Sequence, residues 1–260
     1  GKRVTVIGLG LHGGGLVTAK LMLRHGARVT VTDMKDRHAL ASSITALDKE
    51  VIRLHRRGVK PSLKMVLGRH DERDFASADM VIRNPGVPAE HPLLALAAKN
   101  GVAVESDTSL FFLLCPFRIT AVTGTRGKTT PTMLLAEMAR LPDPRTVVAG
   151  NIRISALEAL DRILKMSRKE PQPLIVLELS SWQLENLEPH RVSPHIGVLT
   201  NIKEDHLNRY RDIEEYAQAK EIIVAFQKPG DIAGLNRDDA RGAAIGESSG
   251  RVTFLKGLWF

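Results

Sequence analysis

The sequence predicts an α/β protein built from two successive domains, each with a parallel sheet covered by helices. Short β-branched runs alternate with helix-compatible segments along most of the chain, and this alternation is typical of parallel sheets. Glycine-rich loops directly follow two of the runs, at residues 8–15 and 123–127. The length of 260 residues, with 43% hydrophobic residues, is enough for two ordinary cores.

The first domain is expected to cover residues 1–116 and to be Rossmann-like. A strand-like run at 3–7 leads through the glycine-rich loop into a helix-like segment at 16–25. A second run at 28–32 then ends on Asp33, which completes a predicted βαβ unit. Further apolar runs extend the predicted sheet: residues 80–82 and 102–104.

The second domain is expected over residues 117–260, as a doubly wound α/β domain of the P-loop ATPase type that is incomplete at its end. The chain restarts with a strand at 118–122, a loop at 123–129 and a helix at 128–140. Four apolar runs predict further strands: residues 146–149, 174–177, 196–199 and 231–235. Helical patterns separate several of these runs: residues 155–168 and 212–227.

Composition and charge narrow the class of protein. No stretch approaches the roughly 20 apolar residues of a membrane span, and the N-terminus begins with a strand-like run instead of a signal peptide. The single cysteine, Cys115, fits a reducing cytoplasm. The net charge of +8 favours an anionic ligand, but with only 4% aromatic residues nucleic acid is not favoured. We therefore expect a soluble, cytoplasmic protein that binds neither membranes nor nucleic acid.

The first glycine loop has the pattern of a nucleotide site. Gly8, Gly10 and Gly13 form G-x-G-x-x-G directly after a predicted strand, and Asp33 lies at the end of the next strand. Glycine permits a tight turn, the following helix offers N–H groups to a diphosphate, and a strand-end carboxylate can accept ribose hydroxyl bonds. By itself the pattern fits an NAD site about as well as a turn that only packs the helix on the strand.

The loop at 123–129 is a more specific signal for phosphate. A strand precedes it, a helix follows it, and Gly127-Lys128-Thr129 places a lysine and a hydroxyl at the helix start. Backbone N–H groups would surround the phosphates, Lys128 would offset their charge, and the Thr129 hydroxyl would complete a Mg²⁺ shell. Val122 stands where the general G-x-x-x-x-G-K-[ST] pattern has glycine, so the loop is a variant, and a Gly-Lys-Thr turn without a ligand is the alternative.

Together with three later segments, this loop resembles that of the Mur ligases, the cytoplasmic enzymes that build the peptidoglycan stem peptide. Glu178-Leu-Ser-Ser-Trp-Gln-Leu-Glu185 is similar to a segment typical of the D-glutamate-adding member. Asn201-Ile-Lys-Glu-Asp-His-Leu-Asn-Arg-Tyr210 and Tyr216-Ala-Gln-Ala-Lys220 resemble two further family motifs. Gly8-Leu-Gly-Leu and Asn84-Pro-Gly-Val-Pro88 resemble its UDP-binding turns, so the resemblance covers nearly the whole chain.

The resemblance implies a role for each matching position. It implies these residues for ATP: Gly124, Thr125, Arg126, Gly127, Lys128, Thr129, Thr130, Asn236 and Asp239. It implies these for the UDP-substrate: Gly8, Leu9, Gly10, Leu11, His12, Asp33, Met34, Lys35, Asn84, Pro85 and Gly86. It implies these for magnesium: Thr129, Glu178, His206 and Lys220. It implies these for catalysis: Lys128, Asn151, His206 and Lys220.

The residues themselves support some of these roles. Glu178 ends an apolar run, and α/β sheets place Mg²⁺ ligands outside the carboxyl ends of their strands. Taken alone, His206 in a polar turn is more often solvated, and Lys220 on a helix is more often a surface lysine with a buried stem.

The implied reaction uses ATP and Mg²⁺ to convert the carboxylate of UDP-N-acetylmuramoyl-L-alanine into an acyl phosphate. The amine of D-glutamate then attacks, and phosphate leaves. Lys128 and the metal would stabilise charge on the phosphoryl group. The resemblance also implies carbamylation of Lys220, and we expect a monomer.

Three positions depart from the family: Arg126 replaces its usual Asn, Arg153 its Gly and Asn208 its Asp. The family also has a C-terminal amino-acid-binding domain, for which residues up to Phe260 leave no room. We therefore expect the chain to bind UDP-substrate and ATP with little turnover by itself.

Three other functions are compatible with parts of the sequence. An NAD-dependent oxidoreductase explains residues 8–33 but leaves Lys128 idle. A folylpolyglutamate synthase shares the loop and the modified lysine but not a UDP-binding first domain. A non-catalytic Mur-like nucleotide-binding protein fits the three departures.

Overall fold

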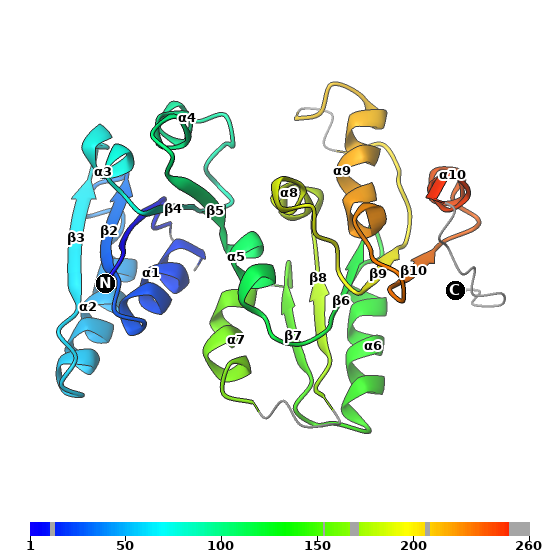
Figure 1. Cartoon of the computed structure of the whole chain (residues 1–260), viewed down its shortest axis with the longest axis horizontal. Coiled ribbons are helices and arrows are strands. Elements are labelled where there is room, and N and C mark those ends of the chain that lie inside the picture. Colours follow the sequence, from blue (N-terminus) through cyan, green and yellow to red (C-terminus); the bar gives the residue numbers. More distant parts are fainter. Residues whose placement is uncertain (11–13, 153, 167–171, 206–208, 250–260) are drawn as a thin grey trace. The chain divides into compact units, whose positions relative to one another are not determined.

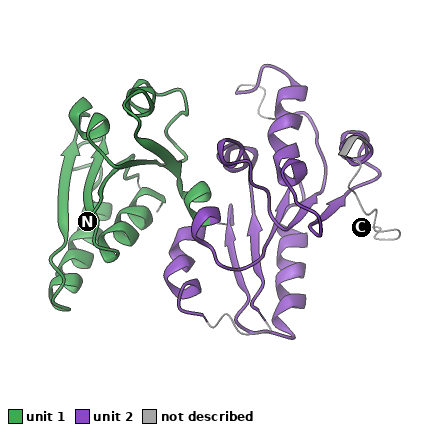
Figure 2. Ribbon diagram, in the orientation of Figure 1, with its two compact units in different colours: residues 1–111 green, residues 112–260 purple. Residues whose placement is uncertain are grey.

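The computed structural model describes residues 1–10, 14–152, 154–166, 172–205 and 209–249. The chain separates into two compact units, Gly1–Phe111 and Phe112–Phe260 (Figure 2). The division falls inside helix α5 (Asp107–Leu114), upstream of the Cys115-Pro116 boundary expected from the sequence. Each unit holds one parallel five-stranded sheet (Figure 1), so the predicted α/β class is confirmed.

The first unit has the sheet order β3-β2-β1-β4-β5, with every neighbouring pair parallel. The predicted strands are present, and β3, which the sequence analysis did not identify, forms one edge. The strands are β1 (Arg3–Ile7), β2 (Arg28–Asp33), β3 (Ser62–Leu67), β4 (Met80–Arg83) and β5 (Ala103–Ser106). The helices besides α5 are α1 (Gly14–Arg24), α2 (Ala41–His55), α3 (Glu72–Ala76) and α4 (Pro92–Lys99). This is the strand order of a Rossmann-like sheet: β2 and β3 are added on one side of β1, and β4 and β5 on the other.

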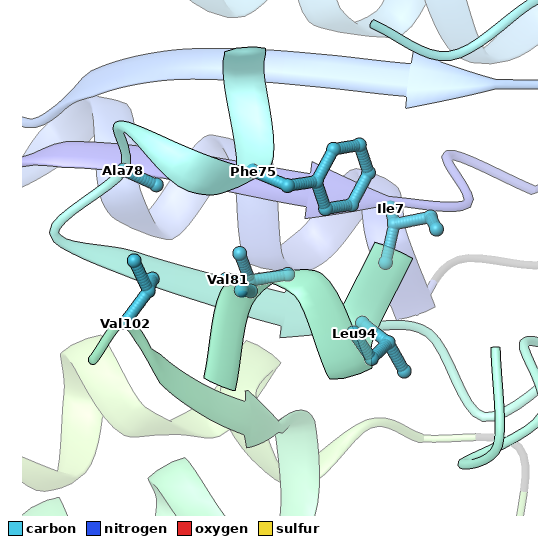
Figure 3. Packing of buried hydrophobic residues seen from close by; sticks show 7 residues of the cluster. Ile7, Phe75, Ala78, Val81, Leu94 and Val102 are labelled. Atoms are coloured by element: carbon cyan, nitrogen blue, oxygen red, sulfur yellow. The ribbon is translucent and has the colours of Figure 1, made fainter. Parts of the chain in front are cut away.

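One face of this sheet packs on α3 and α4. Phe75 is fully buried and, with Val81 and Leu94, surrounds the end of β1 at Ile7 (Figure 3). Burying one such side chain stabilises the fold by roughly 1.5 to 3 kcal/mol. The core therefore fixes the end of β1, which carries the glycine turn.

The second unit has the order β10-β9-β6-β8-β7, again with every neighbouring pair parallel. The five predicted strands are confirmed as β6 (Ile119–Thr123), β7 (Val147–Gly150), β8 (Ile175–Glu178), β9 (Ile196–Leu199) and β10 (Ile232–Leu235). The helices are α6 (Thr129–Arg140), α7 (Ala156–Ile163), α8 (Ser181–Glu185), α9 (Ile213–Ala225) and α10 (Ala240–Ser249), with a 3₁₀ turn at Glu188–His190. All five residues of β6 are buried, as expected for a central strand.

Three helices of this unit differ from the sequence expectation, and one of them, α10, was not predicted. The helix expected at 155–168 ends at Ile163. The short helix α8 was not predicted. It is stabilised by a capping box in which the Ser180 hydroxyl accepts from the backbone N–H of Gln183 and the Gln183 side-chain oxygen accepts from the backbone N–H of Ser180. Among the described helices, none is long and apolar enough to cross a membrane.

Candidate functional site

The loop between β6 and α6 is fastened to the end of the neighbouring strand β9. Gly124 has φ +154°, and a Cβ built there would lie 1.9 Å from Thr200 Oγ1, so glycine is required for this close approach. The N–H groups of Thr125 and Arg126 donate to the backbone oxygen and to Oδ1 of Asn201, at 2.9 and 3.0 Å. These bonds define the shape of the loop.

Two lysines converge on one carbonyl oxygen of this loop. Lys128 Nζ donates to Gly124 O at 3.0 Å and to Thr125 O at 3.1 Å. Lys220, on α9, is 1% exposed, and its Nζ donates to the same Gly124 O at 3.1 Å. The Lys128 ammonium at the start of α6, with Lys220 beside it, suits an anion such as a phosphate.

Lys220 is held away from water. Burial, reinforced by the neighbouring Lys128 and opposed by Asp205, lowers the pKa of Lys220 to about 7. Its Nζ lies 4.6 Å from the centre of the Tyr216 ring, a cation–π contact. A sizeable fraction of this lysine is therefore a neutral, nucleophilic amine near pH 7.

The free energy of unfolding is expected to depend on pH through Lys220. Its pKa in the folded state lies below the ordinary value of 10.5, so the unfolded chain binds the extra proton between about pH 7 and 10.5. The free energy of unfolding is therefore highest above pH 10.5, falls progressively as the pH is lowered from 10.5 to about 7, and is constant with respect to this group below that. In urea unfolding, the free energy of unfolding of wild type minus that of Lys220→Met should rise with pH by up to about 1.4 kcal/mol per pH unit in this window. A difference that is constant with pH would contradict a buried, unmodified lysine.

Glu178, the last residue of β8, lies beside the start of α6. It is 2% exposed, and its carboxylate accepts hydrogen bonds from Thr129 Oγ1 at 2.7 Å and from Asn151 Nδ2 at 3.0 Å. The structure therefore brings together three predicted site residues from three separate segments. A carboxylate beside a hydroxyl offers the hard oxygen ligands that Mg²⁺ prefers, so this donor set fits the metal.

Two of the residues predicted for ATP, Asn236 and Asp239, follow the end of β10. Asn236 Nδ2 donates to Thr200 O at 2.9 Å. Asp239 is 4% exposed, accepts from Gly242 N at 3.0 Å and lies 3.6 Å from Lys203 Nζ. Both residues therefore contact residues 200–203, the segment after β9 that also forms hydrogen bonds with the loop at 123–129.

The carboxyl edge of the first sheet joins the glycine turn to Asn84. Gly8 and Gly10 have φ values of +83° and +65°. Asn84 Nδ2 donates to Gly8 O at 3.0 Å, its Oδ1 accepts from Gly86 N at 3.1 Å, and Pro85 lies in the turn between. These turns follow β1 and β4, the strands between which the sheet order reverses, where α/β sheets bind their ligands.

Asp33 is engaged by the backbone around it. It is 8% exposed, and its two carboxylate oxygens accept from Gly10 N at 3.1 Å and Lys35 N at 2.9 Å. The residue therefore fixes the glycine turn against the loop that follows β2. Next to it, Met34 is 64% exposed, whereas the Leu9 side chain is fully buried and leaves only its backbone for a ligand.

Several residues singled out by the sequence lie outside the described residues: Leu11, His12, Gly13, Arg153, His206 and Asn208. Of the four predicted metal ligands, the structure therefore describes three: Thr129, Glu178 and Lys220. Across the described ranges, no group of three or more His, Cys, Asp or Glu side chains could hold a metal ion.

The sequence analysis missed the residues that shape the loop. Thr200 Oγ1 and Asn201 Nδ2 donate to Arg126 O at 2.9 and 3.0 Å, and Lys203 N donates to Thr125 Oγ1 at 2.9 Å. Asn201 opens a segment that resembles a family motif, but the resemblance gave it no role. The available signal was its position directly after a predicted strand that neighbours the loop's own strand.

Comparison with known proteins identifies the family to which the chain belongs. Residues 122–254, more than half of it, match the family described as Mur ligase middle domain. This chain belongs to the Mur ligase family. Residues 2–106 match a second Mur ligase description, MurD-like, N-terminal domain. The resemblance to Mur ligases is therefore confirmed in both units.

Curated Mur ligases match along most of the chain. UDP-N-acetylmuramoylalanine--D-glutamate ligase of Roseiflexus sp. (strain RS-1) is 44% identical over 238 residues, 92% of this chain and 47% of the relative. The enzyme of the same name from Geobacter metallireducens is 40% identical over 252 residues, 97% of this chain and 50% of the relative. The chain thus spans about half the length of these relatives.

Solved Mur ligase structures share the fold. UDP-N-acetylmuramate:L-alanyl-gamma-D-glutamyl-meso-diaminopimelate ligase from Neisseria meningitides matches with a TM-score of 0.58 at 16% identity, over 95% of this chain and 75% of that one. UDP-N-acetylmuramate-alanine ligase MurC from Thermotoga maritima matches with a TM-score of 0.51 at 20% identity, over 95% of this chain and 52% of that one. At these identities the likeness concerns the fold alone.

Proposed function

We propose that this chain provides the UDP-substrate and ATP sites of a ligase that adds D-glutamate to UDP-N-acetylmuramoyl-L-alanine in peptidoglycan synthesis. The proposal is carried by Lys128 and Lys220, which donate to one carbonyl of a glycine loop in a chain 44% identical to such a ligase. The domains proposed for these sites are residues 1–116 and 117–260. ATP would phosphorylate the substrate carboxylate, and the amine of D-glutamate would displace phosphate from the acyl phosphate.

The loop is suited to hold the transferring phosphoryl group. Lys128 has three N–H donors, and two of them point to Gly124 O and Thr125 O. The third remains for a phosphate oxygen, and the backbone fixes the ammonium before ATP arrives. Preorganised charge of this kind stabilises a transition state without a cost of rearrangement. Thr130, in the first turn of α6, offers a backbone N–H to the same anion.

Thr129, Glu178 and Lys220 are the residues we propose to hold Mg²⁺, with His206. When bound, the metal would neutralise charge on the phosphates. The neutral form of Lys220 supports carbamylation: its amine attacks CO₂, a C–N bond forms and a proton is released, which gives an anion in place of a cation. Asn151 would orient Glu178 through the bond between their side chains.

The edge of the first sheet is proposed to bind the UDP part of the substrate. The glycine turn and the turn at Asn84–Gly86 meet there, beside the exposed Met34 and Lys35. An NAD-dependent oxidoreductase is not favoured, because it would leave the second loop unused. The proposed reaction places the protein in the cytoplasm, and we propose that it acts as a monomer.

Calorimetric titration with MgATP and with UDP-N-acetylmuramoyl-L-alanine tests this function. Each ligand is expected to bind at its own site, so that saturation with one does not block the other. NADH, titrated in the same way, is expected not to displace the UDP compound. Displacement by NADH, or failure of MgATP to bind, would count against the ligase and in favour of the rivals.

A further inference from the structure

A polar cluster links α8 to the segment that leads into α9. Glu185, the last residue of α8, accepts a hydrogen bond from Tyr210 Oη and another from Arg209 Nη2 at 2.9 Å. The Arg209 guanidinium lies 4.8 Å from the centre of the Trp182 ring, which is also on α8. Nothing in the proposed reaction uses these side chains, although α8 begins shortly after Glu178.

The Tyr210 hydroxyl is a fixed donor. The side chain is 5% exposed, and burial together with the Glu185 carboxylate raises the pKa of Tyr210 above its ordinary value, so the phenol keeps its proton. Arg209 balances the charge of Glu185 from the other side. The capping box at Ser180 fixes the start of α8, and this cluster fixes its end.

Packing continues from Tyr210 to the loop. The Tyr210 and Tyr216 rings lie 5.1 Å apart, tilted by 51°, and Tyr216 is 1% exposed. The Tyr216 ring faces Lys220 Nζ at 4.6 Å, and that ammonium donates to Gly124 O at 3.1 Å. A continuous series of buried contacts therefore connects the end of α8 to the loop.

We propose that the hydrogen bond between Tyr210 and Glu185 is a clamp that positions Lys220 against the loop, which makes Tyr210 a positioning residue for nucleotide binding. A lysine has four rotatable side-chain torsions, so packing against a fixed ring, together with the bond to Gly124 O, restricts where the Lys220 nitrogen can lie. The Tyr216 ring lies against Lys220 Nζ, and the Tyr210 ring packs against Tyr216. The hydrogen bond between Tyr210 and Glu185 therefore holds both rings in place. This inference rests on the proposed function, since it requires the loop to hold MgATP.

Calorimetric titration of the chain with MgATP tests the clamp. Tyr210→Phe keeps the ring and removes the hydroxyl, and Glu185→Leu removes the acceptor. Each is expected to weaken MgATP binding about tenfold, and the double variant should be no weaker than Glu185→Leu alone, because Glu185→Leu already lacks the bond that Tyr210→Phe removes. Glu185→Gln retains an acceptor for the hydroxyl and is expected to bind within about threefold of wild type.

Leu160→Ala is the matched control for a general loss of stability. Leu160 is fully buried in α7, which packs against β7 and away from the clamp. It should lower the melting temperature at least as much as Tyr210→Phe while MgATP affinity, measured well below that temperature, stays unchanged. Wild-type affinity in Tyr210→Phe and Glu185→Leu, or an equal loss in Leu160→Ala, would overturn the clamp. Failure of the unsubstituted chain to bind MgATP would overturn the proposed function and the clamp together.

Discussion

Lys128→Met is expected to remove most of the affinity for MgATP and nearly all phosphoryl transfer. Methionine keeps the length of the apolar stem but has no N–H donor and no charge. Losing one charge-assisted contact to the phosphates should weaken binding roughly 10- to 100-fold, and losing it in the transition state should slow transfer by on the order of 100- to 1,000-fold. Calorimetry measures the first effect, and hydroxylamine trapping of the acyl phosphate measures the second.

Lys228→Met is the control for the loss of a lysine as such. Lys228 is exposed in the turn between α9 and β10, outside the loop and its contacts. Its replacement should leave MgATP affinity within about twofold of wild type, as is usual for surface substitutions. If Lys128→Met bound and transferred as well as Lys228→Met, the loop would not be the phosphate site.

Gly150→Ala is expected to be the most destabilising single substitution considered for the second unit. Gly150 ends β7 with φ +106°, and a Cβ there would lie 2.2 Å from the backbone oxygen of Glu178. A backbone atom in a central strand cannot move aside, so strain and overlap should together cost roughly 3 kcal/mol or more. Thermal unfolding should show a drop of roughly 6 to 12 °C.

Gly230→Ala separates the two causes. Gly230 has a similar φ of +91°, but a Cβ there would meet nothing within 4 Å. It should show only the backbone strain, roughly 1 to 2 kcal/mol. Equal losses in the two variants would mean that the contact between Gly150 and Glu178 contributes little.

Hydrophobic patterning predicted most of the fold. The strands that read as uniform apolar runs, such as β6 and β8, were found because central parallel strands are buried on both faces. Strand β3 was missed because its Ser-Leu-Lys-Met-Val-Leu sequence mixes polar with apolar residues at an edge. Helix α8 was missed because five residues carry too few turns for periodicity to show.

The sequence predicted which residues lie near the loop, but it did not predict their hydrogen-bond partners within the protein. Lys128 and Glu178 stand out because they follow a glycine loop and end a strand, whereas Lys220 was identified only through the resemblance to the family. The use of Asp33 by two backbone N–H groups, and of Asn201 as an anchor for the loop, depends on how turns from separate strands meet. That geometry arises only once the sheet has formed.

The shared use of Gly124 O by Lys128 and Lys220 has a consequence for selectivity among nucleotides. Because both side chains meet at Gly124, the Lys128 ammonium and the Mg²⁺ proposed at carbamylated Lys220 would both face the phosphates of a bound nucleotide. A single phosphate can contact only part of this charge, whereas a chain of three phosphates can reach both the ammonium and the metal. The site should therefore rank adenine nucleotides steeply by the length of their phosphate chain, with AMP the poorest ligand.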